Sequence, residues 1–269
     1  MRLRAPSLAR LLGLGQRNGG GPSGQSGTVN AVFVKICGIA HEEDALVAVA
    51  LGADALGFVF APGSPRQISG AAADRIMQRL PRGTTTIGVF RDERPERIIE
   101  LVNTLGLSGV QLHGREPLSE VRWIRQRVPL LIQAFHAGDP AVASAGNGPA
   151  DVVMLDAPEP GSGRVFDWTL AEGVPGGVRF MLAGGLNAEN VADAIFRVRP
   201  WGVDVSTGVE TAMGSGRKDP RKLQRFIEEA KDAGEQLEHA GWNPPASTIE
   251  SVRDGQRGGA PYDWQAEGH

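Results

Sequence analysis

Short apolar runs recur through the middle of the chain with room for one helix between successive runs, and this recurrence constrains the fold more than any other feature. Eight runs indicate buried strands, at residues 31–36, 55–60, 84–90, 109–114, 130–135, 152–156, 178–183 and 203–206. Helical patterns follow most of them, at 41–51, 69–80, 95–105, 118–127, 187–198 and 220–233, with a weak one at 139–148. Eight such units over roughly 200 residues predict an α/β fold, a single-domain (β/α)8 TIM barrel.

A doubly wound open sheet is the alternative fold with the same alternation of strands and helices. Such a sheet does not require eight strands, and its dinucleotide-binding form carries a G-x-G-x-x-G motif after the first strand. That motif does not follow residues 31–36, where the chain continues as Cys37-Gly38-Ile39. The barrel is therefore the fold that we expect.

The two ends of the chain differ in composition from the middle. Residues 1–30 contain four arginines, no acidic residue and a glycine-rich run, which fits a disordered extension, an over-long start or an organelle transit peptide. Residues 236–269 contain Gly, Pro and Ser with scattered charge and no sustained period, which predicts a disordered tail. We therefore expect one catalytic barrel domain at residues 31–235 between two extensions, with the cytoplasm as its location.

The overall composition is that of an ordinary globular enzyme, with 41% hydrophobic and 22% charged residues. A formal net charge of −3 gives no reason to expect nucleic acid or an anionic membrane as a partner. The single cysteine excludes an internal disulfide and most structural zinc sites. No apolar run approaches the roughly 20 residues that span a bilayer. Composition therefore leaves the polar residues at the strand ends to indicate a function.

Cys37 stands where the first predicted strand ends and a loop begins. In (β/α)8 barrels this edge carries the active site, although a free cysteine is often an inert, buried small hydrophobe. A thiol of ordinary pKa, about 8.5, is only a few per cent ionised at neutral pH, so a cysteine base needs help from its surroundings. Strand alternation puts Lys35 on the same face as Cys37, and Asp204 lies on the closing strand. We hypothesise that Lys35, alone or paired with Asp204, sets the electric field at the thiol.

Other polar residues follow the remaining strands at the same predicted edge. Asp156 ends an apolar run, and Pro158 and Pro160 disfavour a helix that it could cap. Burial of an aspartate at such a position favours a general acid. Arg66 in the second loop offers a planar fork for a carboxylate, unless it is a solvated surface charge. His113 is a candidate substrate contact rather than a metal ligand, because no second ligand lies nearby at metal-binding spacing.

The last two loops carry small and hydroxyl residues suited to a phosphate group. Gly184 and Gly185 follow the seventh strand, and Ser206, Thr207 and Gly208 follow the eighth. Barrels commonly bind phosphate at these two loops through backbone N–H groups. Glycine lacks the Cβ that would block a phosphate, and the two hydroxyls are donors. These five residues are therefore a predicted phosphate site, although a plain pair of turns would have a similar composition.

A series of short segments is distinctive when taken in order along the chain. It comprises residues 34–39 (VKICGI), 64–66 (SPR), 88–90 (GVF), 110–114 (VQLHG), 155–156 (LD), 161–163 (GSG), 166–168 (FDW), 182–186 (LAGGL), 204–210 (DVSTGVE) and 216–219 (GRKD). Together these segments resemble the phosphoribosylanthranilate isomerase family of tryptophan biosynthesis. The resemblance covers about residues 32–233 and omits both ends.

The resemblance implies an Amadori rearrangement on a (β/α)8 barrel, without a cofactor or a metal. It implies that Asp156 is the general acid that protonates the furanose ring oxygen of N-(5-phosphoribosyl)anthranilate, and that Cys37 is the general base that removes the C2′ proton. Arg66 then holds the anthranilate carboxylate, and the loops at 184–185 and 206–208 hold the phosphate. We expect a monomer whose partner is this phosphorylated sugar–anthranilate substrate. Two features depart from the family pattern: the loop at 157–160, and Thr207 in place of a common serine.

Two other functions compete with this interpretation. The sister sugar isomerase of histidine biosynthesis runs the same chemistry with two aspartates, and a cysteine at the end of the first strand argues against it. A barrel that has lost catalysis and only binds a sugar phosphate is the second, and the presence of both Cys37 and Asp156 argues against that one. Assays on the substrates of both isomerases would separate these functions.

Overall fold

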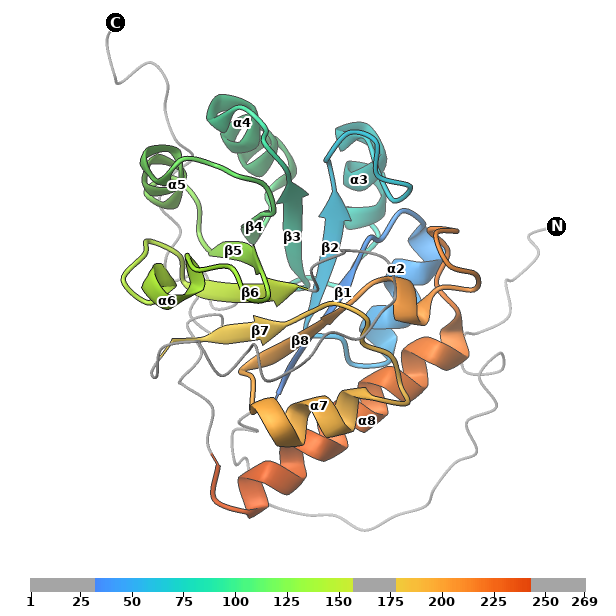
Figure 1. Cartoon of the computed structure of the whole chain (residues 1–269). Coiled ribbons are helices and arrows are strands. Elements are labelled where there is room, and N and C mark those ends of the chain that lie inside the picture. Colours follow the sequence, from blue (N-terminus) through green and yellow to red (C-terminus); the bar gives the residue numbers. More distant parts are fainter. Residues whose placement is uncertain (1–31, 157–177, 243–269) are drawn as a thin grey trace, which may run out of the picture.

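In the computed structural model, which describes residues 32–156 and 178–242, eight strands form one closed barrel (Figure 1). All neighbouring strands run parallel, and the barrel closes where β8 pairs with β1. The strands are β1 (Phe33–Cys37), β2 (Ala55–Val59), β3 (Thr85–Phe90), β4 (Gly109–Leu112), β5 (Leu131–His136), β6 (Val152–Asp156), β7 (Phe180–Leu182) and β8 (Gly202–Val205). The predicted (β/α)8 TIM barrel is confirmed.

Helices surround the barrel, and the last of them, α8, lies beside α7 and α2 (Figure 1). They are α2 (Glu42–Ala50), α3 (Gly70–Met77), α4 (Pro95–Leu105), α5 (Leu118–Arg125), α6 (Val142–Ala145), α7 (Val191–Val198) and α8 (Pro220–His239), with a 3₁₀ helix η2 (Thr207–Val209) after β8. No helix of the described ranges is long and apolar enough to cross a bilayer. The predicted disordered extension at 1–30, most of the predicted tail and the segments at 157–168 lie outside the described residues.

Local signals fix where several helices begin and end. The Ser69 hydroxyl caps α3, and Pro95 occupies the first turn of α4, as the sequence predicts. Gly106 ends α4 with a φ of 64°, a left-handed conformation that glycine adopts without strain. Asp219 caps α8 by accepting two backbone N–H bonds of the first turn, at 2.8 and 3.2 Å. These ends are therefore set by residues close in the sequence.

Two helices, α6 and α8, differ most from the sequence-based prediction. The weak helix expected at 139–148 is reduced to α6, Val142–Ala145, because glycine and serine interrupt the pattern around it. Helix α8 continues to His239, beyond the expected end near residue 233, so residues 236–239 are helical rather than part of a tail. Leu237 is buried in this last turn, and Trp242 packs against the same apolar cluster. Tertiary packing of these two side chains therefore extends the helix.

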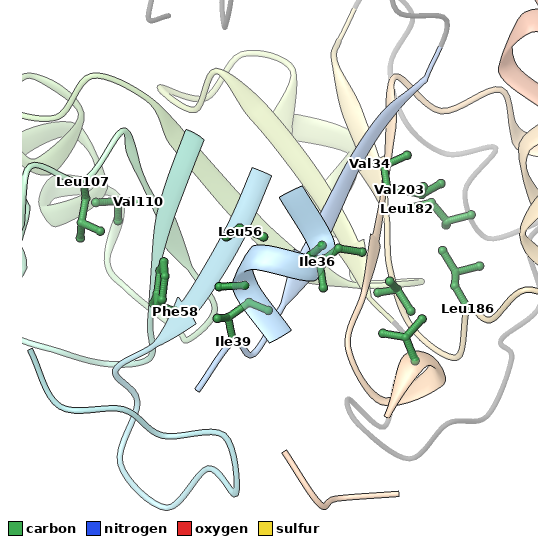
Figure 2. Close-up of a cluster of buried hydrophobic side chains, with 14 of the residues drawn as sticks. Val34, Ile36, Ile39, Leu56, Phe58, Leu107, Val110, Leu182, Leu186 and Val203 are labelled. Carbon is green, nitrogen blue, oxygen red and sulfur yellow. The ribbon is translucent and has the colours of Figure 1, made fainter. Parts of the chain in front are cut away.

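Strand alternation divides the apolar side chains of the barrel into two layers. Outward-facing residues pack under the helices, and Figure 2 shows Val34, Leu182 and Val203 of three adjacent strands in this layer. Inward-facing residues fill the barrel at its amino-terminal end, where the rings of Phe33 and Trp201 stack with centroids 4.6 Å apart. Both faces of each strand are thus covered, which explains the nearly continuous apolar runs in the sequence.

Polar side chains replace apolar ones inside the barrel toward the carboxyl ends of the strands. Lys35 of β1, Gln111 of β4 and Asp204 of β8 are all buried there. Ionisable groups are rarely buried unless they are paired. The barrel interior is therefore apolar at its amino-terminal end and polar at the carboxyl ends of the strands, where a functional site is expected.

Candidate active site

A cavity of about 280 Å³ opens at the carboxyl ends of the strands. Its lining includes every site residue predicted from the sequence: Cys37, Arg66, His113, Asp156, Gly184, Gly185, Ser206, Thr207 and Gly208. A larger hollow of about 950 Å³ lies beside it over α5 and α6 and shares His113. Neither Cys37 nor Asp156 is among the described residues that line this larger hollow. The smaller cavity is therefore the candidate active site.

Lys35 and Asp204 form an ion pair inside the barrel, next to Cys37. Nζ of Lys35 donates to Oδ1 of Asp204 at 2.8 Å, and the Lys35 side chain is fully buried. Strand register explains the pairing, because Lys35 lies opposite Asp204 where β1 meets β8. On the other side of β1, Gly57 lies opposite Cys37, and a Cβ at Gly57 would be 3.0 Å from both the Cys37 Sγ and the Lys35 Nζ. Glycine therefore leaves the space that the thiol and the ammonium group share.

Burial and nearby charges act in opposite directions on the thiol. Burial raises the pKa of Cys37, whereas the ammonium groups of Lys35 and Lys218 lower it, and the net pKa lies above its ordinary value. Burial also lowers the pKa of Lys35, but Asp204 and Cys37 outweigh this effect, so the net pKa of Lys35 is raised and the group is a cation. Lys35 thus acts on the thiol in the direction that we hypothesised, but burial has the larger effect. Cys37 is a neutral thiol in the free protein at neutral pH.

Asp156 ends β6 and belongs to a row of polar side chains that reaches β4. Nε2 of His113 lies 3.2 Å from Oδ2 of Asp156, and Nδ1 of His113 lies 3.1 Å from Nε2 of Gln111. If the neutral ring accepts at Nδ1 from the Gln111 amide, its proton is on Nε2 and faces Asp156. His113 therefore contacts the carboxyl group of Asp156 at the wall of the cavity.

Arg66 reaches from the loop after β2 to the segment after β8. Its Nε donates to Oε1 of Glu210 at 2.6 Å, and its Nη2 donates to Oγ1 of Thr207 at 2.8 Å. The side chain is only 12% exposed, which excludes the alternative of a solvated surface charge. Its aliphatic stem crosses Gly38, the residue after Cys37, where a Cβ would collide with Arg66 Cδ. Arg66 is thus held at the cavity wall, close to the end of β1.

The two predicted phosphate loops lie against each other. Gly184 and Gly185 have φ values of 84° and 66°, which only glycine adopts without strain. A Cβ on Gly208 would collide with the carbonyl oxygen of Leu186, so glycine is also required where the loop after β8 approaches the loop after β7. Ser206 receives a hydrogen bond on its carbonyl oxygen from Lys218 Nζ at 3.0 Å. Both loops therefore line the cavity together, with glycine at each close approach.

Comparison with known proteins identifies the family. A profile of the N-(5'phosphoribosyl)anthranilate (PRA) isomerase family matches residues 34–229. The N-(5'-phosphoribosyl)anthranilate isomerase of Desulforudis audaxviator is 47% identical over 208 residues, which make up 75% of this chain and 98% of that protein. The isomerase of Thermotoga maritima is 43% identical over 204 residues, covering 74% and 98% of the two chains. The chain belongs to the N-(5'-phosphoribosyl)anthranilate isomerase family.

Solved structures of N-(5'-phosphoribosyl)anthranilate isomerases share the barrel. The Thermus thermophilus enzyme matches with a TM-score of 0.70 at 39% identity, over 75% of this chain and 99% of that one. A family member in complex with reduced 1-(o-carboxyphenylamino)-1-deoxyribulose 5-phosphate matches with a TM-score of 0.65 at 40% identity, over the same shares of 75% and 99%. As a family member, the chain is an isomerase of tryptophan biosynthesis. The Thermotoga maritima enzyme is described as dimeric, and a monomeric state and a cytoplasmic location stay predictions for this chain.

Two buried residues beside the isomerase site were not singled out by the sequence reasoning. Glu210 is 0% exposed and Lys218 is 2% exposed, with 3.6 Å between the Lys218 Nζ and a Glu210 carboxylate oxygen. Burial lowers the pKa of Lys218, Glu210 opposes this, and the net pKa is lowered. Both residues lie in segments that resemble the family, at 204–210 and 216–219, which was the only available signal. A charged loop residue is usually solvated, so burial of this pair was not predictable from residue type.

Proposed function

We propose that Asp156 is the general acid and Cys37 the general base of an Amadori rearrangement, which converts N-(5-phosphoribosyl)anthranilate into 1-(2-carboxyphenylamino)-1-deoxyribulose 5-phosphate. One observation carries this proposal: Cys37 ends β1, Asp156 ends β6, and both line the same cavity. A carboxyl group and a thiol that reach one cavity from different strands are suited to donate a proton at one substrate atom and remove one at another.

In the first step, Asp156 donates a proton to the furanose ring oxygen. The C1′–O bond breaks with its electron pair going to that oxygen, and the anthranilate nitrogen forms a double bond to C1′, which gives a cationic Schiff base. The contact between His113 Nε2 and Asp156 Oδ2, at 3.2 Å, supports this role because it limits the orientations of the carboxyl group.

In the second step, the Cys37 thiolate takes the C2′ proton. The electron pair of the C2′–H bond forms a C1′–C2′ double bond, and the Schiff-base nitrogen becomes neutral. The resulting enolamine then tautomerises, losing the proton of its C2′ hydroxyl and gaining one at C1′. Because the Cys37 thiol is neutral in the free enzyme, it first has to lose its own proton to solvent, and the positive charge of the Schiff base favours this ionisation.

The two charged ends of the substrate have separate candidate sites in the same cavity. We assign the anthranilate carboxylate to Arg66, whose guanidinium forms charge-assisted hydrogen bonds in a plane. We assign the phosphate to the loops that contain Gly184, Gly185, Ser206, Thr207 and Gly208. The left-handed glycines and the close approach of the two loops support this assignment, since all five residues line the cavity and no glycine side chain competes with a phosphate for the space.

The loss of substrate fluorescence on turnover tests the acid–base assignment in Cys37→Ser and Asp156→Asn. Both changes keep the shape of the side chain and remove its proton-transfer function. Each variant should lose about 10²- to 10⁴-fold in kcat with little change in KM, which is the usual contribution of a general acid or base.

Asp151→Asn is a matched control next to the other end of the strand that carries Asp156. Asp151 lies just before the amino end of β6 and pairs with Arg125 at 2.7 Å, so its loss should lower stability and leave proton transfer unchanged. Circular dichroism confirms that each variant is folded. A folded Cys37→Ser or Asp156→Asn variant with nearly wild-type kcat would remove that residue from its assigned role.

A further inference from the structure

Glu210 is a fully buried carboxylate that the proposed proton transfers do not use. Its Oε1 accepts from Arg66 Nε at 2.6 Å and lies 3.6 Å from the Lys218 Nζ, while its Oε2 accepts the Gly214 backbone N–H at 2.8 Å. Arg66 and Thr207 are among the described residues that line the active-site cavity, and Glu210 is not. Glu210 therefore lies behind Arg66, where it contacts the arginine rather than a ligand in the cavity.

The contacts of Arg66 leave one side of its guanidinium available. A guanidinium has five N–H groups in one plane. The bonds from Nε to Glu210 and from Nη2 to Thr207 fix that plane, and within the described residues no hydrogen bond from Nη1 is recorded. The N–H groups of Nη1 and the second N–H of Nη2 can therefore form a bidentate pair with a carboxylate.

We propose that Glu210 is a positioning residue for the substrate carboxylate, because it holds Arg66 with the free edge of its guanidinium toward the cavity before the substrate binds. This inference rests on the proposed role of Arg66. An arginine that is already held loses less rotamer freedom when it binds a ligand. Thr207, the second partner of Arg66, belongs to the proposed phosphate loop. The same contacts thus connect the carboxylate and phosphate subsites, and favour a substrate that carries both groups at a fixed separation.

A purely structural role for Glu210 predicts a different result. In that case Glu210 only neutralises Lys218 and Arg66 inside the protein, and its loss lowers stability and weakens every ligand to a similar degree. Positioning of Arg66 instead affects ligands that carry the carboxylate and spares ligands that lack it. Two ligands that differ only in this group therefore separate the two roles.

The experiment compares reduced 1-(o-carboxyphenylamino)-1-deoxyribulose 5-phosphate with the same compound lacking the carboxylate, reduced 1-phenylamino-1-deoxyribulose 5-phosphate. Titration calorimetry measures the Kd of both probes for the wild type and for Glu210→Gln. The Kd of the carboxylated probe should rise about tenfold, and that of the other probe less than about twofold. Equal changes for the two probes, or no change for either, would overturn the inference.

Three further variants make each outcome decisive. Arg66→Met should abolish the preference for the carboxylated probe; if it keeps the preference, the role proposed for Arg66 is wrong. If Arg66→Met loses the preference and Glu210→Gln retains it, only the inference about Glu210 fails. Asp44→Asn is the control, because buried Asp44 accepts the Lys218 backbone N–H at 3.0 Å and should affect both probes equally. Glu210→Asp keeps the charge beside Lys218 and supplies the same comparison if Glu210→Gln does not fold.

Discussion

Replacing Lys35 with methionine removes a buried positive charge beside Cys37 and keeps an apolar side chain of similar length. The Cys37 Sγ and the Lys35 Nζ both lie 3.0 Å from the point where a Cβ of residue 57 would be, so they are at most about 6 Å apart. Two unit charges at about 6 Å interact by about 3 kcal/mol at an effective dielectric constant of about 20. The thiolate population at a fixed pH below the pKa should therefore fall about 100-fold in Lys35→Met.

The pH dependence of catalysis shows in which direction removal of Lys35 shifts the pKa of Cys37. Burial raises the pKa of Cys37 and Lys35 lowers it, so removal of Lys35 should raise that pKa further. The rising limb of kcat/KM against pH reports the pKa of the general base in the free enzyme, so it should move to higher pH in Lys35→Met. The activity of this variant should therefore recover as the pH is increased. Because the chain has a single cysteine, the pH dependence of iodoacetamide alkylation measures the same thiol directly.

Variants of the partner residues separate the charge of Lys35 from its structural role. Asp204 raises the pKa of Cys37, so Asp204→Asn should shift the thiol titration to lower pH, opposite to Lys35→Met. Lys35→Met leaves Asp204 buried without its ion-pair partner, at a cost of about 3–5 kcal/mol of stability, and the double variant should regain much of it. Lys231→Met breaks the ion pair with Asp54 at the amino-terminal end of the barrel and should leave the thiol unchanged. If the Cys37 thiol titrates at the same pH in Lys35→Met and in the wild type, this reasoning is refuted.

Three other substitutions test close approaches and a helix end. Gly57→Ala puts a Cβ 3.0 Å from the Cys37 Sγ and the Lys35 Nζ, so we expect a loss of about 1–3 kcal/mol in thermal unfolding together with lower kcat. Gly208→Ala forces the loops after β7 and β8 apart. The KM and the inhibition constant of inorganic phosphate should both rise roughly 10- to 100-fold. An unchanged inhibition constant for phosphate would contradict the proposed phosphate site. Asp219→Ala removes the cap of α8 and should lower the free energy of unfolding by about 1 kcal/mol. Its kcat/KM should equal that of the wild type.

Much of the fold could be predicted because its signals are local. Apolar runs covered on both faces indicate parallel strands, and Ser69 and Pro95 mark helix ends through contacts within one turn. The prediction was less accurate for α6, whose Gly- and Ser-rich surroundings are weakly helical. It also ended α8 too early, since Leu237 is buried by contacts with residues far away in the sequence. Tertiary packing overrides propensity at such positions.

The candidate site was predictable to the extent that it depends on strand ends. Cys37 and Asp156 could be selected because each ends an apolar run, and the structure brings both to one cavity. Glu210 could not be selected in this way, because a glutamate after a strand has the same local signature whether it is solvated or buried. Its burial follows from its contacts with Arg66, Gly214 and Lys218, which come from different segments of the chain.

The barrel, the family and the shared face of Lys35 and Cys37 follow from the order of residues alone, because a strand has a period of two and the family segments are ordered along the chain. The pairing of Lys35 with Asp204, 169 positions away, follows instead from closure of the folded barrel, which puts β8 beside β1. Burial in the folded chain also raises the pKa of the Cys37 thiol, against the expectation from Lys35 alone. The physical reason is that desolvation and Coulomb energy depend on everything that encloses a group in space, and this enclosure exists only in the folded chain.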